Sequence, residues 1–184
     1  MKAAITSLPG VLLITPEVFG DARGCFFETW NRRRFAESGL DIDFVQDNVS
    51  FSRRGILRGL HFQNPHSQGK LVQALQGEVY DVAVDIRRGS PTFGRWFGCF
   101  LSEVNRQQLF IPAGFAHGFC VTSESALFCY KCTDFYHPSS EFSLRWDDPA
   151  IGIEWPVVEA ELSGKDSAAA NLADFPPDQL PVYR

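Results

Sequence analysis

The chain has 184 residues, of which 45% are hydrophobic and 21% charged, enough for a globular domain with a hydrophobic core. The net charge of −5, with no basic run longer than Arg32–Arg34, argues against a nucleic-acid partner, which requires clustered cations. No apolar run approaches the ~20 residues needed to cross a bilayer, so we expect no membrane partner.

The early part of the chain predicts one strand and one helix. Residues 10–15 form a short apolar run typical of a strand, and residues 20–30 mix turn glycines with aromatics, which suggests a loop entering a strand. A helix is expected between Trp30 and Gly39, with Asn31 as its N-cap and Gly39 at its end.

From Val45 onward, short strands and turns follow one another. Residues 79–87 alternate with period two, placing Tyr80, Val82, Val84 and Ile86 on one face and a more polar set on the other. Further strands are expected at 109–111, 118–121 and 127–133, a spacing typical of a sandwich or barrel. Residues 162–184 predict a helical turn and a tail packed on this barrel, within a single domain over 1–184.

The cysteines indicate a reducing compartment. Their number is odd, their spacing is irregular and no signal peptide precedes them, so we expect a cytoplasmic protein with free thiols at Cys25, Cys99, Cys120, Cys129 and Cys132. Cys129 and Cys132 form a CxxC, but its surroundings resemble a strand and there is no second CxxC for zinc. We therefore expect no metal or redox function there.

The segment 56–72 carries Arg58, His61 and Lys70. Strict strand alternation would place Arg58 and His61 on opposite faces, so a shared site requires a bulge or bend near Gly59. A hydrogen-bonded core histidine in a hairpin is the alternative interpretation of His61.

A second segment, Pro112-x-Gly114-x-x-His117, resembles the second conserved motif of the cupin superfamily. This resemblance implies an all-β, jelly-roll barrel with a central cavity. Many cupins bind a metal through a His-x-His motif, but here the corresponding residues are His61 and Gln63, and His66 lies at the wrong offset. We therefore expect a barrel without metal or other cofactor.

Short motifs also recur in order along nearly the whole chain: Gly20–Glu28, Phe44–Ser50, Leu57–Gln63, Lys70–Val72, Asp81–Arg87, Ser90–Gly94, Ile111–Phe119, Tyr130–Lys131, Trp146–Pro149 and Leu162–Asp166. Together they resemble the dTDP-4-dehydrorhamnose 3,5-epimerase family. The resemblance implies an isomerase that inverts carbons 3 and 5 of a dTDP-linked 4-keto-6-deoxyhexose.

The resemblance also implies catalytic roles. His61 would be the base, Asp166 the carboxylate that orients it, Tyr130 the acid on the opposite face, and Lys70 the cation beside the carbonyl oxygen. The residues alone permit other interpretations: a core aromatic for Tyr130, a solvated turn carboxylate for Asp166 and a solvated loop lysine for Lys70.

The remaining implied residues would bind substrate, with Tyr136 stacking on the base and His117 contacting sugar or diphosphate. Glu28, with Phe26 nearby, would read thymine from the neighbouring subunit, so a homodimer with shared active sites is expected. The implied substrate-binding set is Arg23, Phe26, Glu28, Gln46, Asp47, Asn48, Arg58, Lys70, His117, Tyr136, Glu141 and Lys165.

Three alternatives remain open from the sequence. The first is an epimerase acting at one carbon only, or on a related dTDP-sugar. The second is a metal-dependent cupin oxygenase or isomerase, disfavoured by the missing His-x-His. The third is a non-catalytic sugar-nucleotide binding module, which would have no need of a His–Asp pair opposite a tyrosine.

Overall fold

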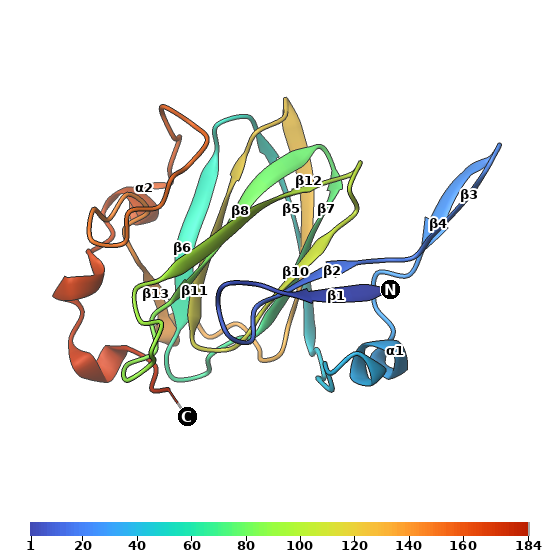
Figure 1. Cartoon of the computed structure of the whole chain (residues 1–184). Coiled ribbons are helices and arrows are strands. Elements are labelled where there is room, and N and C mark those ends of the chain that lie inside the picture. Colours follow the sequence, from blue (N-terminus) through green and yellow to red (C-terminus); the bar gives the residue numbers. More distant parts are fainter. Residues whose placement is uncertain (184) are drawn as a thin grey trace.

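The computed structural model describes residues 1–183 and consists mainly of two antiparallel sheets that face each other (Figure 1). The six-stranded sheet has the order β1-β2-β10-β7-β12-β5, formed by Lys2–Ile5, Leu12–Thr15, Gln108–Ile111, Lys70–Gln76, Ser125–Cys132 and Gln46–Arg53. The five-stranded sheet has the order β13-β6-β11-β8-β9, formed by Glu141–Ser143, Leu57–Gln63, Phe115–Val121, Glu78–Asp85 and Trp96–Ser102. This architecture confirms the predicted cupin-type jelly roll.

The N-terminal region adds a hairpin and a helix. Strands β3 (Val18–Asp21) and β4 (Gly24–Phe27) pair only with each other and project away from the barrel (Figure 1). The sequence suggests a loop entering a strand here, and the two-stranded hairpin corrects this expectation. Helix α1 (Arg32–Glu37) begins as predicted, because the Asn31 side chain accepts a hydrogen bond from the Arg34 amide.

The main core lies between the two sheets. Phe119 on β11 stacks on Phe128 on β12, with ring centroids 4.1 Å apart, so aromatic contacts join one sheet to the other. The buried residues around them are Leu8, Val11, Val72, Ala74, Val79, Ala83, Leu101, Leu109, Ile111, Phe115, Val121 and Ala126.

The C-terminal segment covers the outer face of the five-stranded sheet (Figure 1). It contains α2 (Gly164–Ser167) and the short 3-10 turns η2 (Leu172–Asp174) and η3 (Pro177–Gln179), while η1 (Pro138–Ser140) precedes β13. The apolar side of β8 packs under this cover. The two faces of the alternation predicted for residues 79–87 are therefore both buried, one under the C-terminal segment and the other inside the barrel. The polar side of β8 turns into the barrel. Neither α-helix in the described chain is long and apolar enough to cross a bilayer.

Candidate active site

A cavity of about 590 Å³ lies in the barrel and is lined by both sheets and by the segment 161–166. Eight of the residues singled out in the sequence line it: Arg58, His61, Lys70, His117, Tyr130, Glu141, Lys165 and Asp166. The other lining residues are Ser50, Ile56, Leu57, Phe119, Glu161, Leu162 and Ser163. No role was predicted for Ser50, although it ends the motif Phe44–Ser50, or for Glu161, which lies just outside the motif Leu162–Asp166.

A bulge in β6 brings Arg58 and His61 to the same cavity. His61 pairs with His117, whereas Arg58 pairs with Phe119, so three steps on β6 match two on β11. The extra residue reverses the alternation, as the sequence required for a shared site. Gly59 is needed there, because its φ is +122° and a Cβ would lie 2.6 Å from the Gly118 Cα.

His61 and Asp166 form a close pair. The Nε2 atom of His61 lies 2.6 Å from Oδ1 of Asp166, which is buried at the start of α2. Ser163 caps that helix, its Oγ accepting from the Asp166 amide at 3.1 Å. Burial raises the pKa of Asp166, but the hydrogen bonds from His61 and Ser163 outweigh it and hold the pKa below its usual value. The carboxylate is therefore ionised beside the imidazole.

Tyr130 reaches the cavity from the other side of the barrel. It lies on β12 in the six-stranded sheet, whereas His61 lies on β6 in the five-stranded sheet. Burial raises the pKa of Tyr130, and the nearby Arg58 guanidinium offsets this only partly. The phenol therefore stays protonated near neutral pH and is able to donate a proton.

Lys70 and His117 add two further nitrogen groups to the cavity. Lys70 begins β7 opposite Cys132, and burial lowers the pKa of its ammonium group. His117 Nε2 lies 2.9 Å from Oδ2 of the buried Asp81. Burial lowers the pKa of His117, and the nearby Asp81 carboxylate offsets this lowering only partly. The sequence did not indicate a role for Asp81 in the site, although it falls on the polar side of the alternating strand.

A hydrogen-bonded chain links five of the expected substrate-binding residues. Glu141 pairs with Lys165 and accepts a hydrogen bond from the Tyr136 hydroxyl at 2.8 Å. The Tyr136 amide donates to Gln46 Oε1 at 2.8 Å, and Gln46 donates to Asn48 at 3.0 Å. This chain connects the cavity residues Glu141 and Lys165 to the edge strand β5.

Seven expected binding residues do not line the cavity of this chain. Three of them, Gln46, Asn48 and Tyr136, belong to the hydrogen-bonded chain described above, and the other four lie elsewhere. Arg23 and Phe26 lie on the projecting hairpin, and Phe26 is 66% exposed. Glu28 forms an ion pair with Arg34 at 2.7 Å. Asp47 points to the outer face of β5, where it pairs with Lys131 at 2.8 Å. The structure therefore gives Asp47 no role in this cavity.

The residues at the cupin metal positions already have protein partners. The Nε2 atoms of His61 and His117 face carboxylates, and the buried Gln63 uses its amide on backbone groups. A transition metal ion bound through these two Nε2 atoms and the Gln63 amide would have to displace all of these contacts. The donor set therefore does not fit a metal centre in the barrel, and the absence of a metal requirement remains a prediction.

Cys129 and Cys132 lie three residues apart on β12, so their side chains leave opposite faces of the strand. All five cysteines are free thiols. Burial raises the pKa of both Cys129 and Cys132, which disfavours the thiolate that metal binding or redox exchange requires. Nothing in this arrangement favours a function for the CxxC.

Known proteins match the chain over nearly its whole length. A family model described as dTDP-4-dehydrorhamnose 3,5-epimerase matches residues 5–174. The enzyme of that name from Salmonella typhimurium is 58% identical over 170 residues, which cover 91% of this chain and 93% of the relative.

Solved structures agree with these matches. A dTDP-6-deoxy-D-glucose-3,5-epimerase from Legionella pneumophila, crystallised with dTDP-4-keto-L-rhamnose, has a TM-score of 0.97 and 50% identity, covering 100% of this chain and 98% of its own. A 3'-monoepimerase from Streptomyces bikiniensis, in complex with dTDP-quinovose, has a TM-score of 0.90 and 34% identity, covering 97% and 92%. The chain belongs to the dTDP-4-dehydrorhamnose 3,5-epimerase family.

Proposed function

We propose that this enzyme inverts carbons 3 and 5 of dTDP-4-dehydro-6-deoxyglucose to give dTDP-4-dehydrorhamnose. The ketone at carbon 4 acidifies the hydrogens on both neighbouring carbons, so each centre can be inverted by removing and returning a proton. One observation carries this proposal: a histidine–carboxylate pair and a tyrosine reach one cavity from facing sheets.

Proton abstraction is assigned to His61. Its Nε2 is engaged by Asp166 at 2.6 Å, which leaves Nδ1 to take the proton from the sugar carbon. As the imidazole becomes charged, the ionised Asp166 stabilises the imidazolium and holds the ring in place. The electron pair of the broken C–H bond moves into the enolate, whose oxygen becomes negative.

Stabilisation of the enolate is assigned to Lys70 and reprotonation to Tyr130. A positioned ammonium group next to the developing oxyanion is worth several kcal/mol in such a site, roughly the 2.7–4 kcal/mol measured for single oxyanion donors. Tyr130 then donates its phenolic proton to the opposite face of the carbon, which inverts the centre. Solvent afterwards reprotonates Tyr130 and takes the proton from His61, so the second centre can follow.

The nucleotide carrier is assigned to the cations and hydrogen-bonding groups around the cavity. Arg58 and Lys165 suit a diphosphate, because guanidinium and ammonium groups bind phosphate oxygens through charge-assisted hydrogen bonds. Tyr136 is half exposed and linked to Gln46 and Glu141, a position that suits stacking on the base.

We further propose a homodimer with shared active sites. The β3–β4 hairpin carries Arg23 and the exposed Phe26 away from its own barrel (Figure 1). The edge strand β5 exposes Val49 (64%) and Phe51 (62%) on the outer face of the sheet, an apolar surface suited to a partner chain. Sedimentation should give twice the chain mass, and a fully active monomer would contradict the proposal.

The chain is proposed to work as one domain in the cytoplasm. Strands β1 and β2 belong to a barrel sheet, and the C-terminal segment covers the other sheet, so both ends contribute to the same fold. The five free thiols suit a reducing compartment.

The test is to follow the reaction in heavy water by NMR. Deuterium should enter at carbons 3 and 5, with both centres inverted in the product. Inversion at one carbon alone would favour a single-position epimerase instead. No exchange at all with a dTDP-4-keto-6-deoxyhexose would favour a non-catalytic binding module.

A further inference from the structure

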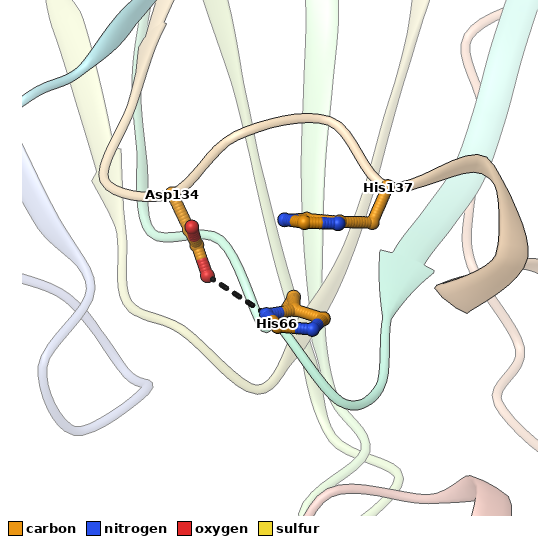
Figure 2. A group of neighbouring side chains, drawn as sticks. All are labelled: His66, Asp134 and His137. Atoms are coloured by element: carbon orange, nitrogen blue, oxygen red, sulfur yellow. Dashed lines mark ion pairs between the residues drawn. The ribbon is translucent and has the colours of Figure 1, made fainter.

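Two loops outside the catalytic cavity bring together a second group of polar side chains. His66 lies in the loop after β6, and Asp134 and His137 lie in the loop after β12 (Figure 2). One donor atom from each residue lies within 4.8 Å of the other two. The two imidazoles are stacked, with ring centroids 3.9 Å apart and planes at 16°.

The distances suit a shared cation better than a direct contact. Nδ1 of His66 lies 3.6 Å from Oδ2 of Asp134, which is too long for a hydrogen bond. Two ligands that each lie about 2.0–2.2 Å from one ion are separated by a distance of this kind. Figure 2 shows a nitrogen of each ring at the edge turned toward Asp134. To bring the three donor atoms onto one ion, an imidazole need only rotate about its terminal torsion, for which the energy minimum is broad.

The loops are held in this arrangement by one buried side chain. Gln63 donates to the carbonyl groups of His66 at 2.7 Å and Phe135 at 3.2 Å, and its Oε1 accepts from the His137 amide at 2.8 Å. Gln63 is only 4% exposed. The same amide thus fixes the backbone of both loops, so the three donors are held close together by the fold itself.

We propose that His66, Asp134 and His137 form a binding site for a divalent transition-metal ion such as Zn²⁺. Two imidazoles and a carboxylate are a donor set that borderline cations prefer, whereas Mg²⁺ prefers oxygen ligands and retains its water. The site lies apart from the catalytic machinery, because none of its residues lines the cavity that contains His61 and Tyr130. Bound metal would join the two loops.

The test is calorimetric titration of untagged, chelator-treated full-length protein with ZnCl₂. We expect one Zn²⁺ per chain and a melting temperature that rises by several degrees at saturating metal. Mg²⁺ should produce neither effect. The variants His66→Asn and His137→Asn should each weaken binding at least tenfold. Asparagine suits position 66, where φ is +68°, so this change removes the imidazole without adding strain.

Two control variants assign the binding. Asp147→Asn alters an exposed carboxylate elsewhere, paired with Arg145, and should leave Zn²⁺ affinity unchanged. His61→Asn removes a cavity histidine and should also leave it unchanged. Failure of Zn²⁺ to bind at millimolar concentration would overturn the proposal. Binding that survives both loop variants, or that disappears in His61→Asn, would overturn it too.

Discussion

Replacing Asp166 by asparagine tests whether the carboxylate acts through His61. Asp166 is 4% exposed and 2.6 Å from the imidazole, so the change removes one buried, charge-assisted hydrogen bond with little change in shape. Such bonds contribute roughly 1.5–3 kcal/mol, and the loss falls on the step in which the imidazolium forms. Since about 1.36 kcal/mol corresponds to a tenfold change in rate, kcat should fall roughly 10- to 150-fold.

The assay is the initial rate of deuterium incorporation and product formation by NMR at saturating substrate. KM should change little, because Asp166 is not assigned to the carrier. Ser143→Ala is the matched control: its hydroxyl lies 3.4 Å from the same carboxylate, a long contact whose loss should cost little activity. A folded Asp166→Asn enzyme with wild-type kcat, or with a defect confined to KM, would refute the reasoning.

Four further outcomes are expected. Gly59→Ala should lower both activity and the free energy of unfolding, the latter by about 1–3 kcal/mol or more, because the side chain meets Gly118 and the bulge cannot form; chemical denaturation measures this. Asp85→Asn should destabilise the fold by roughly 3–5 kcal/mol, since this buried carboxylate accepts from Arg87, Ser90 and Thr92. Burial raises the pKa of Asp85, but those hydrogen bonds outweigh it and hold the pKa below the unfolded value of 3.8. The stability that Asp85 contributes is therefore present above pH 3.8 and is lost as pH falls through the lower folded pKa. In the variant, the free energy of unfolding should fall less steeply with pH in this acid range. Arg23→Ala should raise KM with little effect on kcat in steady-state kinetics, and an unchanged KM would count against shared sites. Activity should survive exhaustive chelation, and loss rescued by one divalent ion would revive the metal-dependent alternative.

Local patterns predicted the elements whose formation depends on neighbouring residues. The Asn31 cap and Gly39 mark α1 in sequence, and the alternation of residues 79–87 marks β8. The bulge at Gly59 was also predictable, because strict alternation cannot place Arg58 and His61 on the same face of β6. In each case the signal lies within a few residues of the feature.

Features that depend on long-range packing left no such signal. Asp81 meets His117 only because β8 and β11 are neighbours in the sheet, although 36 residues separate the two. His66 meets Asp134 and His137 because Gln63 ties two distant loops together. The family resemblance supplied the roles of Asp166 and Tyr130, whose local surroundings favoured a turn and a core aromatic.

The most direct test of the two-face mechanism is the Tyr130→Phe variant in heavy water, followed by NMR. His61 remains in place, so the enolate should still form and exchange its proton, returned by the imidazolium or by water, while inversion falls steeply. In His61→Ala, exchange and inversion should both fall by at least the roughly two decades that a general base contributes. If Tyr130→Phe lost exchange and inversion in equal measure, Tyr130 would not be the acid on the opposite face.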